Sequence, residues 1–482
     1  MESTLVIAAI IIVQLVIVFG FVMLERREPH ATLAWILGVV MVPVIGVVVY
    51  LLFGLRRTVY RHKRAERVAL RMRHVYHQWQ VARKARGAGT ARLPVRTRHL
   101  VELGVRTAGS YASPDNQVSV LINGGDTYRA IRDAIEAAVD HVHVQFYIIQ
   151  PDESGEGLRA HLIAKARAGV TVRVLCDALG SMRLPKDFWD PLIAAGGRAA
   201  YYSPIRLAPM FRHRDHVNFR NHRKIVVVDG KVGLTGGINI GREYLGLDPT
   251  IGAWRDTHVR IEGAAVLTLQ KTFVEDWLVS TEELLDNERY FPEPPATAPG
   301  TATVQALASG PDRPWAVIHH IHFLAVAQAN HRVWLTTPYF VPDRVIQTAL
   351  VTAALRGVDV RLLVPLRSDS RLVDWASRFY FPELLEAGVR IYQYDAGFLH
   401  AKTMVVDDWL AAIGSSNMDI RSFQLNYELT AFIYDEATTQ SLADQYRTDL
   451  EQARELSPKW PRSLSYPRRV LYAFAGLLSP LL

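Results

Sequence analysis

The sequence predicts an α/β protein built from two related halves and preceded by a membrane-spanning helical hairpin. Three observations support this prediction: two uncharged apolar runs open the chain, strand–helix–strand patterns occur in two similar series, and one set of polar residues recurs at matched spacing. The 482 residues are 49% hydrophobic and 21% charged. That balance excludes both a disordered chain and a multi-span transporter.

The hairpin is predicted over residues 1–55, with spans at 4–24 and 33–55. Thr4–Leu24 and Leu33–Leu55 are uncharged over 21 and 23 positions. A helix rises 1.5 Å per residue, so the first run reaches about 31 Å, enough to cross the hydrocarbon core. A cleaved signal peptide fits less well, because no Lys or Arg precedes Arg26 and no small-residue cleavage site follows.

A basic juxtamembrane segment is predicted at residues 56–110. Between Arg56 and Arg98 it has 14 Lys or Arg against one acid, Glu66, although the net charge of the whole chain is only +8. Positive charge beside a span favours the cytoplasmic side, so we expect the catalytic body in the cytoplasm. We also expect this segment to contact an anionic membrane surface rather than nucleic acid.

The rest of the chain repeats one pattern of strands and helices. Residues 142–149 and 333–337 are strand-like, and each run is followed by a helical stretch and then by a second strand that opens at Gly169 or Gly357. Such units indicate mostly parallel sheets covered by helices. We therefore predict a first half at 111–300, a second half at 301–455 and an amphipathic C-terminal tail at 456–482.

The repeat is sharpest at a polar motif, H-x-K-x-x-x-x-D, with an asparagine further on. In each copy the Lys lies two, the Asp seven and the Asn 17 positions after the His. The two copies, residues 222–239 and 400–417, comprise His222, Lys224, Asp229 and Asn239, and His400, Lys402, Asp407 and Asn417. Two matched sets of four polar residues indicate one shared site rather than two isolated buried histidines.

These residue types at this spacing suit a phosphate. Residues two apart on a strand point to the same face, so each His and Lys should share a cleft, to which a hairpin return would bring the Asn. Lys offers a positive charge and Asn offers hydrogen-bond donors to phosphate oxygens. The two halves would then place one histidine on each side of a phosphorus, while each Asp holds a turn at its strand end.

A metal site is not expected. A zinc site built from His213, His216 and His222 would lack a cysteine or carboxylate ligand at suitable spacing. The single cysteine, Cys176, also excludes an intramolecular disulfide.

With these motifs the sequence resembles the phospholipase D superfamily, which implies two pseudo-twofold-related α/β/α sandwich halves. The flanking segments are similar to the bacterial cardiolipin synthases of that superfamily. They are the hairpin itself with residues 43–46 (PVIG), residues 339–342 (YFVP), residues 426–428 (NYE) and residues 479–482 (SPLL). The likeness covers essentially the whole chain.

The resemblance implies an enzyme of the bacterial cell membrane that transfers a phosphatidyl group reversibly between two phosphatidylglycerol molecules, giving cardiolipin and glycerol. It implies a phosphohistidine intermediate and no cofactor. The implied nucleophile is His222, and His400 acts first as an acid and then as a base. The implied phosphate-holding residues are Lys224, Lys402, Asn239 and Asn417, and the structural members of the catalytic motif are Asp229 and Asp407.

In similar enzymes a buried acid orients each histidine. Glu428 lies 28 positions after His400 and is expected to serve the second half. The first half departs from the pattern, because Thr250 occupies the matching position, and we expect Asp256 to serve His222 instead.

Other functions remain open at this point. Water as the acceptor would make the protein a phospholipase D-type hydrolase, and phosphatidylethanolamine could be a co-substrate of the synthase. A nuclease of the same superfamily and an inactive membrane scaffold are further alternatives. The oligomeric state leaves no mark in the sequence.

Overall fold

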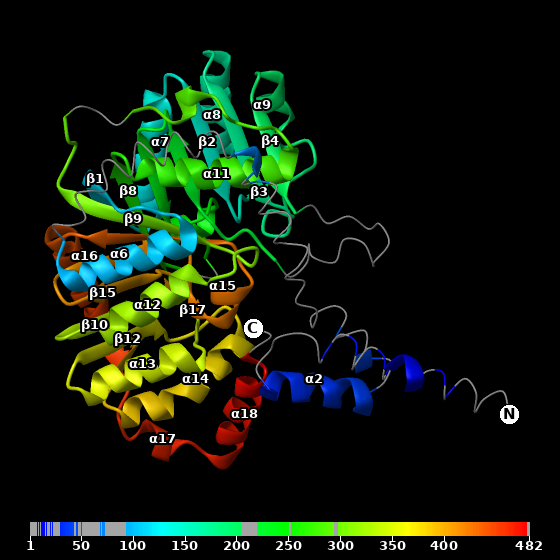
Figure 1. The fold of residues 1–482 in the computed structure, drawn as a ribbon, viewed down its shortest axis with the longest axis vertical. Coiled ribbons are helices and arrows are strands. Elements are labelled where there is room, and N and C mark those ends of the chain that lie inside the picture. Colours follow the sequence, from blue (N-terminus) through cyan, green and yellow to red (C-terminus); the bar gives the residue numbers. More distant parts are fainter. Residues whose placement is uncertain are drawn as a thin grey trace.

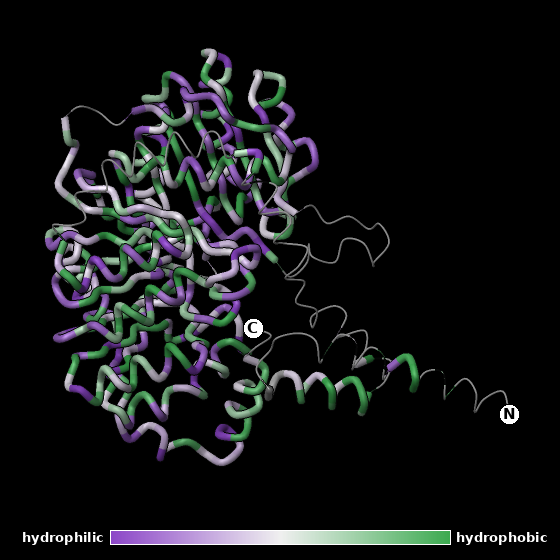
Figure 2. Tube along the Cα trace, viewed as in Figure 1, coloured by the Kyte–Doolittle hydropathy of each residue, from purple (hydrophilic) through white to green (hydrophobic). Residues whose placement is uncertain are grey.

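The computed structural model describes residues 93–479 except 204–218, 250–251 and 294–296, together with residues 29–42 and isolated positions between 7 and 72. Most of the first predicted span therefore lies outside the described residues. So does most of the second predicted span beyond residue 42. Helix α2 (Pro29–Met41) is apolar along most of its length (Figure 2). Among the described residues, no helix combines the length and apolarity that crossing a membrane requires.

In the described part of the chain, one sheet of 15 strands runs through the molecule (Figure 1). The first-half strands are β1 (Ser113–Ile122), β2 (His141–Phe146), β3 (Thr171–Asp177), β4 (Arg198–Tyr202), β5 (Ile225–Val228), β6 (Val232–Gly236) and β8 (Thr257–Glu262). The second-half strands are β9 (Ala302–Ser309), β10 (Arg332–Thr336), β12 (Asp359–Pro365), β13 (Arg390–Tyr394), β15 (Thr403–Val406), β16 (Leu410–Gly414), β18 (Glu428–Tyr434) and β19 (Ala453–Glu455).

The strand order is symmetric about the pair β9–β1. It runs β19-β13-β12-β10-β15-β16-β18-β9-β1-β8-β6-β5-β2-β3-β4, so each strand on one side has a counterpart on the other, apart from β19 at one edge. Strands β5 and β15 follow the two His-x-Lys sequences and are equivalent in this arrangement. The two halves thus share one continuous sheet.

The expectation of mostly parallel sheets is wrong in its detail. The parallel pairs are β2·β3, β3·β4, β10·β12 and β12·β13, and the remaining neighbours in the sheet are antiparallel. The reason is the hairpin after each motif: β5 returns as β6 and β15 returns as β16, which reverses the chain at the centre of each half. The strand–helix–strand units occupy only the outer parts of the sheet.

Helices cover both faces of the sheet. One face carries α7 (Asn123–Ala137), α8 (Glu153–Arg167) and α9 (Asp190–Ala194) in the first half, and α12 (Val317–Ala327), α13 (Arg344–Leu355) and α14 (Arg371–Glu386) in the second. The other face is covered by α11 (Val266–Thr281) and α16 (Glu436–Glu451). Helix α6 (Val95–Ala108), within the basic segment, packs on α12 and β9.

Burial on both faces explains why the motif strands are continuously apolar. In β5, Ile225 and Val227 pack into the core beneath α11, whereas Val226 and Val228 pack into the core beneath α7 and α8. A strand covered on both sides reads as a continuous apolar run, and β-branched residues suit it. The core beneath α11 and α16 contains residues of both halves, so the halves are joined by packing as well as by the sheet.

Short elements complete the fold around the ends of the motif strands. They are η4 (Arg242–Leu245), β7 (Trp254–Arg255), η5 (Glu288–Tyr290), β11 (Phe340–Val341), β14 (Phe398–Leu399), β17 (Met418–Asp419) and α15 (Ile420–Gln424). The predicted C-terminal tail contains α17 (Trp460–Ser463) and α18 (Tyr466–Leu477).

Candidate active site

One cavity of about 330 Å³ lies between the two halves and is lined by both motif histidines. His222 and His400 lie just before β5 and β15, rather than within the strands as predicted. Asn239 and Asn417 line the same cavity, so the hairpin returns do bring them beside the histidines. The remaining lining residues are Tyr147, Ile148, Arg220, Tyr244, Trp254, Tyr339, Val341, Asp369, Val373, Asp419, Arg421 and Asn426.

Each histidine is oriented by a carboxylate of the opposite half. His222 Nδ1 lies 3.0 and 3.1 Å from the two carboxylate oxygens of Glu428. His400 Nδ1 lies 2.7 Å from Asp256 Oδ2. The two predicted acids are therefore present, but the expected pairing of Glu428 with His400 and of Asp256 with His222 is wrong.

The crossed pairing follows from how the halves meet. Strand β14, which leads into His400, pairs in parallel with β7, which leads into Asp256. Asn221 and Tyr427 form the equivalent bridge before His222 and Glu428. The backbone N–H of each histidine donates across this contact, His222 to Tyr427 and His400 to Arg255.

These hydrogen bonds determine which nitrogen of each histidine can react. A carboxylate at Nδ1 accepts its N–H and leaves the Nε2 lone pair for chemistry. Burial lowers the pKa of His222 and lowers that of His400 to about 4, and nearby lysines act in the same direction. In the free site both imidazoles are therefore neutral at pH 7.

The two motif lysines are buried beside the histidines. Lys224 Nζ donates to the His222 carbonyl at 2.7 Å, and Lys402 Nζ donates to the His400 carbonyl. Burial lowers the pKa of Lys224 to about 7 and that of Lys402 to about 8, while Glu428 and Asp256 oppose this shift. A phosphate anion beside the two ammonium groups would favour their charged forms.

The orienting carboxylates stay ionised. Burial alone would raise the pKa of Asp256, but Lys402 and His400 lower it below its usual value. The pKa of Glu428 is lowered in the same way, against the effect of burial, by His222 and Lys224. Each acid can therefore stabilise the imidazolium that forms when its histidine takes up a proton.

Sequence reasoning missed a difference between the two acids. Ser415 Oγ donates to Glu428, and Asn426 Nδ2 donates to it at 3.2 Å. The equivalent of Ser415 is Gly237, where a Cβ would lie 2.1 Å from Asp256 Oδ1. The Gly–Ser difference between the two copies of the motif is the signal that points to this asymmetry.

Asp229 and Asp407 do not line the cavity. Asp407 accepts hydrogen bonds from the backbone N–H groups of residues 330, 331 and 332, and Asp229 accepts from those of residues 139, 140 and 141. Both residues have positive φ, 53° and 48°. Each carboxylate thus ties the turn after its motif strand to the start of the neighbouring strand.

Several other groups in the cavity have no repeated counterpart. Arg220 lies two positions before the motif histidine His222, and Asn426 lies two positions before the orienting acid Glu428. Aromatic rings flank the histidines, with Tyr147 5.1 Å from His222 and Trp254 5.1 Å from His400 between ring centroids. Because these residues differ between the halves, a search for internal repeats does not find them.

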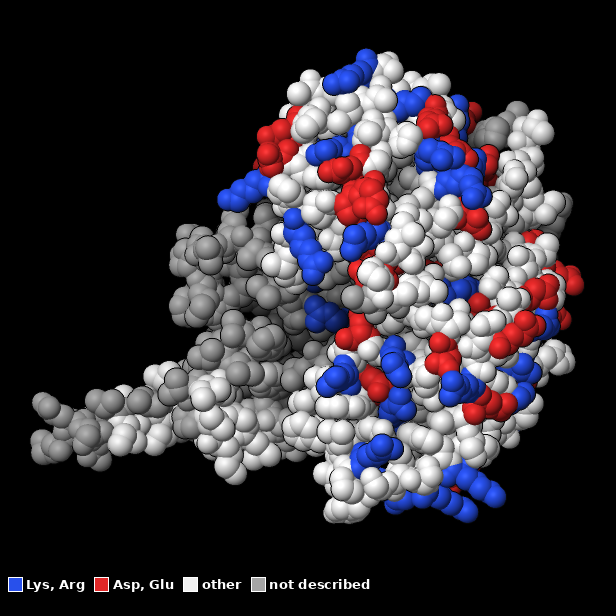
Figure 3. All heavy atoms as spheres, turned by 180° about the vertical axis from the view of Figure 1, so that it is seen from behind, with Lys and Arg blue, Asp and Glu red and all other residues white. Residues whose placement is uncertain are grey.

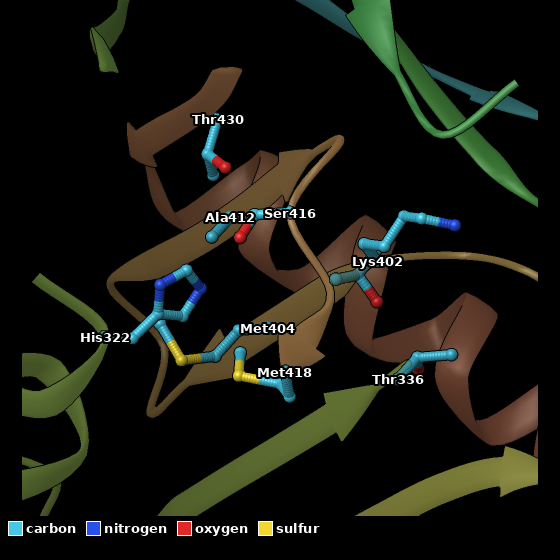
Figure 4. A pocket seen from close by; sticks show the side chains of 9 residues that line it. His322, Thr336, Lys402, Met404, Ala412, Ser416, Met418 and Thr430 are labelled. Atoms are coloured by element: carbon cyan, nitrogen blue, oxygen red, sulfur yellow. The ribbon is translucent and has the colours of Figure 1, made fainter. Parts of the chain in front are cut away.

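A second, much smaller cavity of about 10 Å³ lies behind Lys402 (Figure 4). His322, Ser416 and Thr430 line it together with two methionines, and burial lowers the pKa of His322 to about 4. At the position equivalent to Thr430 the first half has His258, which is fully buried. The two lysines therefore have different surroundings, although their motifs match.

No metal centre is evident in the described part of the chain, where no cluster of three or more His, Cys, Asp or Glu side chains could hold an ion. His213 and His216, which the zinc alternative would use, lie outside the described residues.

Comparison with known proteins places this site in a family. Residues 131–277 and 323–452 match the family described as "Cardiolipin synthase, PLD-like domain", and residues 5–54 match "Phospholipase_D-nuclease N-terminal". The chain is 43% identical to a cardiolipin synthase of Geobacillus thermodenitrificans, over 97% of this chain and 92% of that protein. It is 39% identical to a cardiolipin synthase of Halalkalibacterium halodurans, over 98% and 93%.

A solved structure supports the fold. The phosphatidylserine synthase of Haemophilus influenzae matches with a TM-score of 0.58 and 18% identity, covering 76% of this chain and 95% of that one. Taken with the near full-length relatives, the duplicated motif and the shared cavity, these matches establish that the chain belongs to the phospholipase D-like cardiolipin synthase family.

Proposed function

We propose that the protein makes cardiolipin by moving a phosphatidyl group between two phosphatidylglycerol molecules, with the two histidines acting in sequence on one phosphodiester. Family membership supports the overall reaction and its class, a phosphatidyltransferase. The observation that supports the mechanism is the pair of histidines in one cavity, each hydrogen-bonded through Nδ1 to a buried carboxylate.

In the first step, His222 Nε2 attacks the phosphorus of one phosphatidylglycerol. The bond from phosphorus to the glycerol headgroup oxygen breaks, and His400 gives that oxygen a proton, so free glycerol leaves. A covalent phosphohistidine remains, which divides one difficult displacement into two easier ones. His400 is neutral in the free site, and the phosphodiester anion would raise its pKa so that it can carry this proton.

In the second step, the now neutral His400 takes the proton from a headgroup hydroxyl of a second phosphatidylglycerol. The hydroxyl oxygen attacks phosphorus, the bond to His222 breaks, and cardiolipin forms. Over the two steps one P–O bond to a glycerol hydroxyl breaks and an equivalent P–O bond forms, so the overall reaction is reversible. One histidine thereby serves first as acid and then as base.

The phosphate-holding role falls to Lys224, Lys402, Asn239 and Asn417. Negative charge builds on the non-bridging oxygens during both steps, and buried donors stabilise it more than water does. Both asparagines line the cavity, where an amide Nδ2 can donate to a phosphate oxygen. Asp256 and Glu428 would orient the histidines, and Asp229 and Asp407 would hold the motif turns.

We further propose that spans at 4–24 and 33–55 anchor the catalytic body to the bacterial cell membrane. The uncharged runs support this, as does the match of residues 5–54 to the N-terminal family module. The basic segment at 56–110 favours a cytoplasmic body beside anionic lipid. The proposed domains are the hairpin 1–55, this segment, the halves 111–300 and 301–455, and the tail 456–482.

Among the alternatives, nucleic-acid binding has the least support. Basic and acidic side chains are interspersed on the face drawn in Figure 3, whereas a nucleic-acid surface gathers positive charge. Hydrolysis differs from the proposal only in the acceptor, which would be water. The use of phosphatidylethanolamine differs only in the phosphatidyl donor.

The acceptor can be identified with acyl-labelled phosphatidylglycerol and the full chain in vesicles. We expect label in cardiolipin and one glycerol released per cardiolipin. Label that accumulates in phosphatidic acid would instead identify a hydrolase. Adding headgroup-labelled phosphatidylethanolamine tests the third possibility, because its use as phosphatidyl donor would release ethanolamine.

The histidine roles can be tested by substitution. His222→Ala and His400→Ala are each expected to abolish transfer while the protein stays membrane-inserted, because each removes one reacting group. With a phosphatidyl ester of nitrophenol, whose departure needs no acid, acid-labile phosphate should be trapped on the His400→Ala protein but not on the His222→Ala protein. The opposite trapping result would assign the nucleophile to His400.

A further inference from the structure

The C-terminal helix α18 carries an apolar stripe that faces solvent. Tyr466, Val470, Phe474 and Leu477 are 79%, 50%, 59% and 78% exposed. They are spaced by four, four and three positions, so they lie along one side of the helix. Four large apolar side chains in one row differ from the isolated exposed leucines that most surfaces have.

The opposite side of α18 is fixed to the body. Ala475 is buried, as is Ser479 just after the helix, and Gly476 lies so close to α14 that a Cβ there would meet the Phe379 ring at 2.6 Å. Phe379 itself is 46% exposed beside this contact. The stripe is therefore held outward by tight packing on its back.

This position connects the stripe to the active site. Helix α14 packs against α18 and also supplies Val373 to the wall of the catalytic cavity. Residues 373 and 379 are six apart on one helix, which corresponds to about 9 Å along its axis. A surface that α18 touches would thus lie close to the cavity.

The charged side chains of the C-terminal segment are all basic. From Leu456 to Leu482 the sequence has no Asp or Glu, and its basic residues are Lys459, Arg462, Arg468 and Arg469. All four are exposed. An outward apolar row with flanking cations is typical of a helix that lies in the interface of an anionic bilayer.

We propose that α18 is an interfacial membrane helix: its stripe inserts among the headgroups of an anionic bilayer and holds the cavity mouth at the depth where the lipid phosphates lie. The proposal rests on the lipid substrate of the proposed function, but not on the roles given to the histidines. A second copy of the chain is the competing occupant of the stripe.

Site-specific labelling separates the two occupants. The only cysteine, Cys176, is buried, so a cysteine introduced at the surface can be labelled selectively. Full-length Phe474→Cys protein carries an environment-sensitive fluorophore in vesicles of phosphatidylglycerol and phosphatidylethanolamine with a spin-labelled lipid. The matched control is Leu355→Cys, at the end of α13, where the native side chain is 70% exposed.

The lipid-borne spin label is expected to quench the fluorophore at position 474 several-fold more than at position 355. Equal quenching at the two positions would overturn the proposal. So would a label at 474 that is shielded from lipid and whose signal depends on protein density, because that result identifies a second copy as the occupant.

An activity measurement tests the consequence for catalysis. The double variant Val470→Asp/Phe474→Asp should lose at least tenfold of its activity on long-chain phosphatidylglycerol in vesicles. It should retain activity on dissolved short-chain phosphatidylglycerol, which needs no bilayer. Leu355→Asp should lose neither activity, and His222→Ala should lose both, so failure of the proposed chemistry is distinguishable from failure of α18. Full vesicle activity in the double variant would contradict the proposal.

Discussion

At the scale of single residues, the site depends on carboxylates that lie far from their histidines in the sequence. Glu428 is 206 positions from His222, and Asp256 is 144 positions from His400. The crossed arrangement makes the two acids separable by experiment, because each should affect only the step in which its own histidine acts.

Glu428→Gln and Asp256→Asn are each expected to lower kcat about 10²- to 10⁴-fold, because the histidine loses its tautomer and its counter-charge. A phosphatidyl ester of nitrophenol tells them apart, since this leaving group departs without an acid. Asp256→Asn, which affects His400, should regain a rapid burst of nitrophenol, whereas Glu428→Gln should not. If only Glu428→Gln regained the nitrophenol burst, each acid would instead act on the histidine of its own half.

The pH dependence follows from the same burial. His222 must be neutral to attack, and its pKa is lowered from 6.5, so kcat/KM should fall only below pH 6.5. His400 must carry a proton to release glycerol, and the lysine cations beside the histidines are lost as the pH rises through about 7 and 8, so kcat/KM should also fall from about pH 7 upward. Bound phosphodiester raises both lysine pKa values, so kcat should fall at higher pH than kcat/KM. Profiles of kcat and kcat/KM against pH test this prediction, and it would be wrong if both fell at the same alkaline pH.

The residues that could be predicted from the sequence are those that the two halves repeat. His222 and His400, with their Lys and Asn partners, share one spacing. The histidines and asparagines meet in one cavity, whereas the lysines do not line it and are buried beside the histidine carbonyls. The partner of each acid could not be predicted, because spacing along the chain does not reveal which half lies opposite. The cavity residues outside the repeat, such as Trp254, were missed for the same reason.

At the scale of elements, the motif hairpins are held by their aspartates. Asp407 accepts three backbone hydrogen bonds and is 3% exposed, whereas its neighbour Asp408 forms a surface ion pair with Arg332 and is 70% exposed at its side chain. Asp407→Ala leaves three N–H groups without their acceptor at a position of positive φ.

Asp407→Ala is therefore expected to cost on the order of 2–3 kcal/mol of unfolding free energy. The control variant Asp408→Ala should change it by less than about 1 kcal/mol, as exposed ion pairs do. Thermal unfolding measures both changes. If Asp407→Ala unfolded like the native protein while losing transfer, the aspartate would have a direct chemical role instead.

The type of element was more predictable than its direction. The apolar runs before and after each motif did mark buried strands. We predicted too many parallel pairs. A strand that is buried on both faces has a continuous apolar sequence whether its neighbours run parallel or antiparallel, so the sequence does not reveal the direction. The hairpins β5–β6 and β15–β16 supply the antiparallel centre of each half.

At the scale of the whole molecule, the internal repeat predicted two halves but not their junction. Strands β1 and β9 join the halves into one sheet, and their sequences carry no mark of pairing with each other. Side chains of both halves also share the core beneath α11 and α16. Each half thus has its own core on one face of the sheet, and the two halves share a further core on the other face.

This architecture predicts that neither half works alone. A chain divided at residue 300 would leave His222 in one fragment and its carboxylate Glu428 in the other, and the same holds for His400 and Asp256. Each fragment would also expose part of the shared core, and helix α6 would be separated from α12, on which it packs.

We expect residues 1–300 and 301–482, expressed singly, to show no phosphatidyl transfer. Co-expressed, they should purify together and recover measurable transfer, because the sheet and the shared core rebuild both crossed histidine–carboxylate pairs. A co-expressed pair in which one fragment carries Glu428→Gln provides the control, since it should assemble equally well but stay inactive. Transfer by residues 301–482 alone would show that one motif suffices, which the crossed pairs do not allow.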